Sequence, residues 1–559
     1  MPASCLGVPP LNVVLLMLDD LRYDQVEVMP EVAARMEATG VTFTRAYQGT
    51  PLCAPMRASL LSGGFPAAET GVRTNDAPAG GVTAFVDTDT LPVRLQAAGY
   101  ATGLVGKYLN GYQDLGAYVP PGWTEWAAWR DADDWSHYHL VEGTSGATAA
   151  EGVGVAHDTY IAEFQGEWAA RFIGAHRDQP FFLDVGFIAP HEPHIPAAED
   201  AGSYAEAVYR GGAYQEADVS DKPAWIQALP LLTAEEEALT DLAHRERQET
   251  LLAVDRAISR IQAALEASGV AERTVVVLVS DNGVLWGEHR LFDKGVPYQE
   301  AVHAPLLVWN PGLRAFEAPA LVDPGLDIAA TIEVLAGLTP RSRGIDLTPV
   351  LCGTGTTGRD HVLVQDWSRD GESWSGLVTA RTTYVEWATG ERELYDRDAD
   401  PFEEVSLHDD PARAEEIADL AATLDDERAL GGAQRALATA TAGRPYTHSL
   451  EVWGGTPPLR WARLGGALPH GMDLDEDGVL TGTPREAGTF PFAVRVEDGS
   501  VSPVTGGPQS VVAHLTLTVE EAPDVGKGGE EPGCGCGAGR ATGAAAWLAA
   551  ALSWRRRRR

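Results

Sequence analysis

The chain has 559 residues, of which 44% are apolar and 22% are charged. These values describe a large globular protein with room for more than one domain, and they exclude a disordered or membrane-embedded chain. The formal net charge is −38, so the average surface repels nucleic acid, and we expect no nucleic-acid partner. An anionic substrate would need a local pocket of positive charge.

Strand and helix patterns alternate through most of the chain. An apolar run predicts a buried strand of a parallel sheet at Asn12–Leu18. Further strands are predicted at residues 181–188, 274–280 and 305–309, and helices at 158–176 (with Asp158 as its N-cap), 247–268 and 327–336. This alternation favours an α/β fold whose sheet is covered by helices on both faces. Polar residues that could form a site follow three of these strands, where ligands of such sheets gather.

The chain changes character after Val362, where short strand patterns precede a helix that ends near residue 430. We interpret residues 431–444 as a linker and residues 445–520 as an all-β module, which resembles the immunoglobulin-like modules of bacterial surface proteins. Its segment 473–478 imitates an EF-hand loop, but Pro484 stands where the bidentate glutamate belongs. An acidic hairpin turn is the better interpretation.

The C-terminal end, residues 534–559 after a linker at 521–533, has three parts. Cys534 and Cys536 precede an apolar stretch, Ala541–Trp554, and five arginines close the sequence. This end resembles the sorting signals of myxobacterial surface proteins, which implies export, cutting by a sorting protease and anchoring at the cell surface. A weak helix with a basic end is the alternative. Because no export signal precedes the first strand, we expect the true start to lie upstream.

The five cysteines are too few and too unevenly spaced to predict a disulfide framework or a paired zinc site. Cys53 differs from the others because it opens the sequence Cys-Ala-Pro-Met-Arg, which continues as a helix pattern to Gly63. This C-x-P-x-R motif resembles the signature of the sulfatase family, whose fold is alkaline-phosphatase-like with a small C-terminal β subdomain.

The resemblance implies how Cys53 would act. In sulfatases a formylglycine-generating enzyme oxidises this cysteine to an aldehyde, and the hydrated aldehyde carries two hydroxyl groups. One hydroxyl attacks sulfur, and the other later loses its proton and expels sulfate as the aldehyde forms again. A serine would remain as its sulfate ester.

Three carboxylates and one amide follow two of the predicted strands. Their oxygens suit Ca²⁺ or Mg²⁺ better than zinc. In sulfatases the matching residues, together with the formylglycine, hold one Ca²⁺. The predicted ligands are Asp19, Asp20, Cys53, Asp281 and Asn282.

The remaining site residues also follow from the family pattern. Lys107 and Lys294 match lysines that bind sulfate, and Arg57 matches the arginine that supports the hydrated nucleophile. His191 matches a sulfate contact that donates a proton to the leaving alkoxide. Asn110 is expected to contact substrate, with Asp281 as a candidate base, and His289 either faces the pocket or is an ordinary loop histidine.

The resemblance covers residues 10–410, which we divide into a catalytic domain (1–365) and a C-terminal subdomain (366–430). The segments GKYLN and VPPGWTEW resemble N-acetylglucosamine-6-sulfatases and heparan endosulfatases, which implies a sulfated sugar or glycosaminoglycan substrate. GEHRLFDKG resembles other branches and leaves the substrate open. Tryptophans in the segment 112–138 could form a sugar-stacking rim or packed core.

Two other functions remain open. One is hydrolysis of a phosphoester or phosphonate ester, since some phosphonate hydrolases share the formylglycine motif. The other is non-enzymatic glycan binding at the cell surface by a catalytically decayed relative, against which the full set of nucleophile, ligands and cations argues.

Overall fold

The computed structural model describes residues 5–7, 9–64, 70–143, 155–340, 344–356, 358–367, 373–428, 432–433, 437, 439–450, 452–453, 459–501 and 508–521. The predicted sorting tail lies outside them. The chain forms two compact units, Met1–Pro66 with Val72–Ala421, and Ala67–Gly71 with Ala422–Arg559. Among the helices of the described residues, none has the length and apolar character that a membrane span requires.

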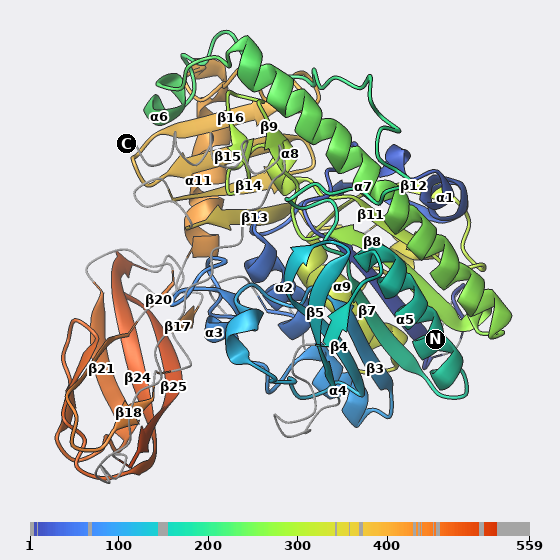
Figure 1. Cartoon of the computed structure of the whole chain (residues 1–559). Coiled ribbons are helices and arrows are strands. Elements are labelled where there is room, and N and C mark those ends of the chain that lie inside the picture. The colour runs from blue at the N-terminus through green and yellow to red at the C-terminus, as the bar shows by residue number, and fades with distance from the viewer. Residues whose placement is uncertain are drawn as a thin grey trace. The chain divides into compact units, whose positions relative to one another are not determined.

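A ten-stranded mixed sheet forms the centre of the first unit (Figure 1). Its strands, in spatial order, are β12 (Phe316–Val322), β2 (Val41–Ala46), β11 (Leu306–Trp309), β8 (Thr274–Ser280), β1 (Asn12–Leu18), β7 (Phe181–Gly186), β3 (Ala101–Gly106), β4 (Glu125–Asp134), β5 (His137–Gly143) and β6 (Val155–His157).

Strand β1 lies in the middle of this sheet and is buried over its whole length. It pairs in parallel with β7 on one side and with β8 on the other. The predicted bounds of β1 and β8 are confirmed, whereas β7 ends at Gly186 and β11 begins at Leu306. Strands β1, β7 and β8 run parallel to one another, and antiparallel pairing begins outside them, with β11 beside β8. The three central strands therefore end at the same edge of the sheet.

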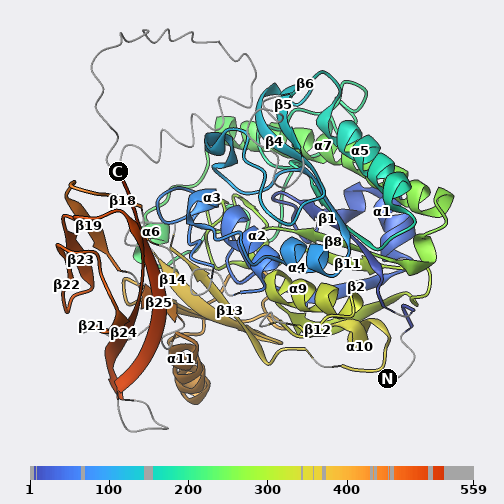
Figure 2. The ribbon, with the colours of Figure 1, turned by 90° about the horizontal axis from the view of Figure 1, so that it is seen from below.

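Helices cover both faces of the sheet, as Figures 1 and 2 show, which confirms the predicted fold class. The helices α2 (Cys53–Ser62), α4 (Leu91–Ala97) and α9 (Pro324–Leu335) pack on one face, and α5 (Ile161–His176) and α7 (Ala234–Ala267) on the other. Alternate residues of β1 belong to the two cores, since Leu15 faces the first group and Leu16 the second.

All three predicted helix starts are wrong. Helix α9 begins at Pro324, three residues before the predicted start. Helix α5 begins at Ile161, and Tyr160 at its N-cap makes no side-chain cap, so Asp158 does not cap it. Helix α7 begins at Ala234, thirteen residues before the predicted start. Its first turns are acidic and lack an apolar period, but Thr233 and Glu236 form a capping box. That capping box was the signal in the sequence for the true start.

The shorter elements of this unit connect the sheet to its helices. They are η1 (Val26–Val28), α1 (Pro30–Val32), η2 (Ala33–Glu37), α3 (Gly81–Ala84), η3 (Tyr112–Leu115), α6 (Ala224–Gln227), η4 (Ala271–Arg273), α8 (Gln299–Val302) and α10 (Thr348–Leu351), with a small hairpin of β9 (Leu285–Trp286) and β10 (Phe292–Asp293).

A four-stranded antiparallel sheet follows the main sheet in sequence. Its strands are β13 (His361–Asp366), β14 (Trp374–Thr379), β15 (Thr382–Trp387) and β16 (Arg392–Asp396). The short helix η5 (Pro411–Arg413) leads into α11 (Ala414–Arg428). These elements match the β-rich pattern and final helix that the sequence predicts after Val362.

The described residues from Gly432 onward form only strands and turns, as predicted for residues 445–520. Their strands are β17 (Gly432–Ala433), β18 (Ala440–Thr441), β19 (Tyr446–Ser449), β20 (Val452–Trp453), β21 (Arg460–Gly466), β22 (Met472–Leu474), β23 (Val479–Gly482), β24 (Gly488–Val501) and β25 (Pro508–Glu520). Two of them, β17 and β18, lie within the range predicted as a linker. The acidic segment is a hairpin turn, in which Asp475 Oδ1 accepts hydrogen bonds from the amides of Asp477 and Val479.

The cysteine spacing predicts no disulfide framework, and the described residues contain one disulfide that the sequence did not indicate. Cys5 and Cys352 are bonded, with their Cα atoms 5.5 Å apart although 347 positions separate them in sequence. A single bridge between residues so distant in sequence leaves no local spacing pattern, because only the fold brings the two segments together. Cys53 is a free, buried cysteine.

The tryptophans of segment 112–138 belong mainly to the packed core. Trp123, Trp126 and Trp135 are almost fully buried. The indole of Trp126 donates to the hydroxyl of Tyr112 at 2.9 Å and packs edge-on against that ring. The structure therefore favours core packing over a sugar-binding rim for these three residues.

Candidate functional site

The carboxyl ends of β1 and β8 bring the predicted metal ligands together. Leu18 and Ser280 are paired in the parallel register, so the residues that follow them are neighbours. The amide of Asp20 donates to Asp281 Oδ1 at 3.2 Å. Asp20 has φ +70°, a left-handed conformation that non-glycine residues seldom adopt and that often marks a functional loop.

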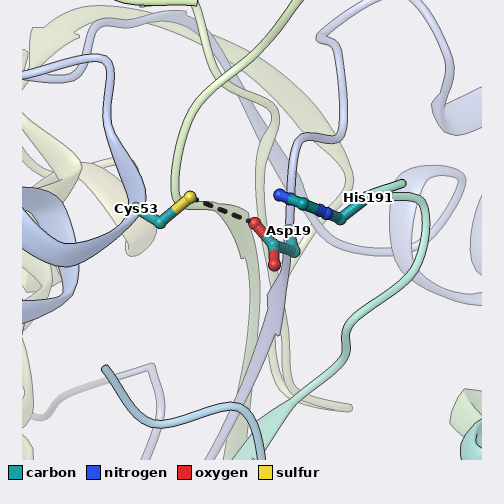
Figure 3. Close-up of side chains that lie close together, drawn as sticks. All are labelled: Asp19, Cys53 and His191. Atoms are coloured by element: carbon teal, nitrogen blue, oxygen red, sulfur yellow. Dashed lines mark hydrogen bonds between the residues drawn. The ribbon is translucent and has the colours of Figure 1, made fainter. Parts of the chain in front are cut away.

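Cys53 begins helix α2 and points into this group of carboxylates. Its Sγ atom lies 3.3 Å from Asp19 Oδ1, and the side chain is completely buried. Figure 3 shows Cys53 and His191 on either side of Asp19. The next amide, that of Ala54, donates to Asn75 Oδ1 at 2.9 Å, which holds the start of the helix in place.

Arg57 lies one turn farther along α2 and connects three parts of the site. Its Nε donates to Asp281 Oδ2 at 2.7 Å, and its Nη1 donates to the carbonyl of Lys107 at 3.0 Å. Both side chains of the Arg57–Asp281 ion pair are buried. The spacing from Cys53 to Arg57 thus places both residues on one helix, facing the ends of β8 and β3.

Two lysines enter the site from different segments. Lys107 follows β3, and its Nζ lies 2.5 Å from Asp19 Oδ2. Lys294 follows β10, pairs with Asp20, and lies 3.0 Å from Cys53 Sγ through its Nζ. Both ammonium groups therefore contact carboxylates of the cluster around Cys53.

His191 follows β7 and approaches the carboxylates from the side opposite Cys53. Its Nε2 lies 3.9 Å from Asp20 Oδ2, and its Nδ1 lies 2.6 Å from the carbonyl of Glu192. Since a carbonyl accepts at Nδ1, that nitrogen carries a proton, and Nε2 faces the site. The ring is partly exposed, so a substrate can reach it.

The structure places the two predicted substrate contacts differently. Asn110 follows Lys107 in the same loop, where its carbonyl accepts from Val82 and its buried Oδ1 has no hydrogen-bond partner among the described residues. His289 is completely buried, with Nδ1 2.7 Å from Glu216 Oε2 and its ring stacked on Tyr298. Burial lowers the pKa of His289 to about 3. Both substrate contacts remain predictions.

The pKa values of the cluster depend on the balance between burial and the lysines. Burial alone would raise the pKa of Asp19, but the positive charge of Lys107, followed by those of other neighbours, holds it well below its usual value. Burial, together with the charge of Asp19, raises the pKa of Asp281. Burial and the nearby carboxylates also raise the pKa of the Cys53 thiol to about 12. The unmodified thiol is therefore neutral near pH 7 and a weak nucleophile.

Several features of these residues fit a hard divalent cation. Ligand atoms of Asp19, Asp20, Cys53 and Asp281 all lie within 4.8 Å of one another. Asn282 Oδ1 is buried and accepts no hydrogen bond from any described residue. Three crowded carboxylates and an unpartnered amide oxygen are the donors that Ca²⁺ prefers, and a cation would offset their mutual repulsion.

Sequence reasoning missed some residues that support the site. Ser280 accepts the amide of Leu21 at 2.8 Å, and Asn75 holds the start of α2. Arg247 of α7 bonds the carbonyls of Asp20 and Pro190. None of these residues belongs to a recognisable local motif. Only Ser280 could have been noticed from the sequence, because it ends an apolar run that predicts a strand.

Three sequence profiles of known protein families match this chain. The sequence profile described as Sulfatase matches residues 11–338. The profile described as N-sulphoglucosamine sulphohydrolase, C-terminal, matches residues 287–429. An Ig-domain profile matches residues 431–520.

Three curated relatives are similar to this chain over about three fifths of its length. A human N-acetylglucosamine-6-sulfatase is 29% identical over 376 residues, covering 63% of this chain and 67% of the relative. An extracellular sulfatase SULF-1 homolog of Drosophila melanogaster is 28% identical over 363 residues, covering 63% of this chain and 32% of the relative. A Caenorhabditis elegans homologue of the same kind is matched over 47% of its length. The chain thus spans half or less of these last two relatives.

A solved structure of a protein in complex with its substrate D-glucosamine-2-N,6-O-disulfate shares the fold of this chain, with a TM-score of 0.66 and 22% identity. The superposition covers 75% of this chain and 97% of that one.

Proposed function

The chain belongs to the sulfatase family, and we propose that it hydrolyses sulfate esters of a sulfated sugar or glycan. The reaction is R–O–SO₃⁻ + H₂O → R–OH + SO₄²⁻ + H⁺. The observation that carries the proposal is the position of Cys53. It opens a C-x-P-x-R helix and lies 3.3 Å from Asp19 and 3.0 Å from the ammonium group of Lys294. Carboxylate ligands and anion-binding cations thus surround one residue of the signature motif.

In this proposal a formylglycine-generating enzyme, using an external oxidant such as molecular oxygen, oxidises the β-carbon of Cys53 to an aldehyde and releases its sulfur as hydrogen sulfide. The aldehyde takes up water to become a diol. One diol oxygen forms a bond to sulfur while the bond from sulfur to the sugar oxygen breaks. The second hydroxyl then loses its proton, the aldehyde forms again, and the carbon–oxygen bond to sulfate breaks. The unmodified Cys53 thiol is neutral near pH 7 and a weak nucleophile, which supports the proposal that Cys53 must be converted before it can react.

The oxygen atoms of Asp19, Asp20, Asp281 and Asn282, with the group at position 53, would hold Ca²⁺, with Mg²⁺ as the alternative. When bound, the ion supplies polarisation of a sulfate oxygen and lowers the pKa of a diol hydroxyl. The hard-oxygen donor set and the unpartnered Asn282 Oδ1 support this assignment.

Other side chains would stabilise and protonate the reacting groups. Lys107 and Lys294 lie where they can balance negative charge on the sulfuryl group. Arg57 holds the nucleophile helix against Asp281. His191, whose Nε2 faces the cluster, would donate a proton to the leaving sugar oxygen.

For the substrate we propose a sulfated glucosamine unit of a glycosaminoglycan. The segment around Lys107 and Asn110 supports this choice, as do relatives named N-acetylglucosamine-6-sulfatase and extracellular sulfatase. We further propose that the protein is exported. The Cys5–Cys352 disulfide supports export, because such bonds persist in oxidising compartments. Anchoring through a sorting protease remains a proposal that rests on the tail alone.

Mass spectrometry of the peptide that contains Cys53, from protein made with the formylglycine-generating enzyme, tests the first step. We expect the aldehyde or its hydrate in place of the thiol. Converted and unconverted protein are then compared on matched sulfate, phosphate and phosphonate esters and on a panel of sulfated glycans. Faster turnover of sulfate than of phosphate by the converted form alone is expected. Preference for phosphate or phosphonate, or glycan binding without turnover, would refute the proposal.

A further inference from the structure

Arg247 lies on the long helix α7, far along the chain from every motif of the site, yet it contacts two of the loops that carry site residues. Its side chain is only 1% exposed. The Nη2 group donates to the carbonyl of Asp20, and Nη1 donates to the carbonyl of Pro190 at 3.2 Å. Nε donates to Gln25 Oε1 at 2.9 Å, and the guanidinium packs over the ring of Trp286.

The two carbonyls belong to residues whose placement matters for the site. Asp20 has the left-handed backbone conformation described above, and its side chain contributes to the carboxylate cluster. Pro190 directly precedes His191, whose ring lies beside Asp20. A second bond joins the same loops, since the amide of Asp19 donates to the carbonyl of Ala189 at 3.4 Å. The segments that follow β1 and β7 are thus joined by adjacent hydrogen bonds, and the side chain of Arg247 supplies one of these links.

The chemistry of the contact requires a guanidinium. Arginine presents several N–H donors in one rigid plane and can satisfy three acceptors from different segments at once, whereas lysine offers one nitrogen. Among the described residues Arg247 forms no ion pair, unlike Arg256 on the same helix, which pairs with Asp200 and Glu163. A buried guanidinium bonded only to neutral acceptors is costly as a stabilising contact. The hydrogen bonds of Arg247 are therefore better suited to fixing the positions of the two loops than to raising the unfolding free energy.

We propose that Arg247 is a positioning residue that holds the metal-ligand loop at Asp20 and the loop of His191 in register with Cys53. This inference rests on the proposed function, because it assigns Arg247 to the same site. Arg247 itself bonds the main chain of these loops and not the reacting atoms. Substitution of Arg247 should therefore displace both the metal ligand Asp20 and the proton donor His191, because residues that hold ligands from outside the first shell affect metal affinity and activity together.

The test compares Arg247→Lys with Arg256→Lys in the converted full-length protein. We measure Ca²⁺ affinity by calorimetry, kcat and KM separately, the melting temperature, and hydrogen exchange of peptides that cover residues 19–25 and 187–194. For Arg247→Lys we expect Ca²⁺ affinity and kcat each to fall by ~10- to 100-fold, with little change in KM and faster exchange in both peptides. The Arg256→Lys control should lose some thermal stability but keep Ca²⁺ affinity and kcat.

A second variant, Gln25→Met, keeps Arg247 but removes its Nε acceptor, and it decides the question if Arg247→Lys does not fold. For Gln25→Met we expect smaller decreases in Ca²⁺ affinity and kcat than for Arg247→Lys. Wild-type Ca²⁺ affinity and kcat in either folded variant, or equal losses in the Arg256→Lys control, would overturn the proposal. If the wild-type protein turns over no sulfate ester, Ca²⁺ affinity and exchange still test Arg247, so failure of the proposed function is a separate outcome.

Discussion

Arg57 and Asp281 form an ion pair in which Nε lies 2.7 Å from Oδ2 and both side chains are buried. The pair joins the helix that begins at Cys53 to the end of the central strand β8. It also gives Asp281 two tasks, since its other carboxylate oxygen accepts the amide of Asp20. Substitutions at Asp281 and at its neighbour Asn282 should therefore differ in their consequences.

We expect Asp281→Ala to lose both bound Ca²⁺ and stability. Removing one partner of a buried ion pair leaves the other charge uncompensated, which typically costs about 3–5 kcal/mol. Asn282→Ala removes a neutral ligand and should weaken Ca²⁺ binding at a much smaller cost in unfolding free energy. Elemental analysis and denaturant unfolding measure the two effects. Full occupancy by zinc, with neither calcium nor magnesium, would contradict the ligand assignment.

Two substitutions of Cys53 distinguish the role of the attacking hydroxyl from the role of the second hydroxyl of the diol. Cys53→Ala should abolish turnover while leaving the fold largely intact, because only one small group is removed. Cys53→Ser keeps one hydroxyl, so we expect at most one transfer that leaves a stable sulfate ester on the protein. Intact-mass measurement after incubation with substrate detects that ester. Near-normal hydrolysis by Cys53→Ala would exclude the proposed mechanism.

The Cys5–Cys352 disulfide leads us to expect effects on both the stability and the cellular location of the protein. Replacing Cys5 and Cys352 together by alanine should lower the unfolding free energy by about 2–5 kcal/mol, since the bond closes a very long loop. Activity of the folded variant should be unchanged. Peptide mapping of native protein without reduction should recover the linked pair, and cell fractionation should find it outside the cytoplasm. Two free thiols at these positions in a cytoplasmic product would contradict the proposed export.

Patterns with a local physical cause were predicted well. The central strands β1 and β8 are apolar over their whole length because helices cover both faces, and their bounds could be predicted to the residue. The residues that follow them, Asp19 and Asp281, could be placed at one edge because parallel strands end together. The same logic could not place Lys294, which only a resemblance to the family linked to the site.

Features that depend on long-range packing could not be predicted. The start of α7 is polar and lies outside any apolar period, so only the cap at Thr233 marked it. The bond between Cys5 and Cys352 and the contacts of Arg247 join segments that only the folded chain brings together. The burial of His289 depends on Glu216 and Tyr298, which are distant in sequence or in another loop.

Asp184 should make stability depend on pH in a way that a single substitution can reveal. The residue lies on β7 inside the core, and its Oδ1 has no hydrogen-bond partner among the described residues. Burial raises the pKa of Asp184 to about 7, although Arg57 opposes the shift. The folded protein therefore keeps this proton up to about pH 7, whereas the unfolded chain releases it near its ordinary value of 3.8.

Because the unfolded state binds fewer protons between these two values, the contribution of Asp184 to stability falls as pH rises from about 4 to about 7 and then levels off. The difference corresponds to at most roughly 4 kcal/mol. Asp184→Asn imitates the neutral acid at every pH, so the variant should match the wild type near pH 4 and exceed it in stability at pH 8. Denaturant unfolding of both proteins across this range measures the difference. Asp323, whose pKa burial also raises to about 7, remains in both proteins and cancels. Stability curves that run parallel from pH 4 to pH 8 would show that Asp184 is already ionised in the folded protein.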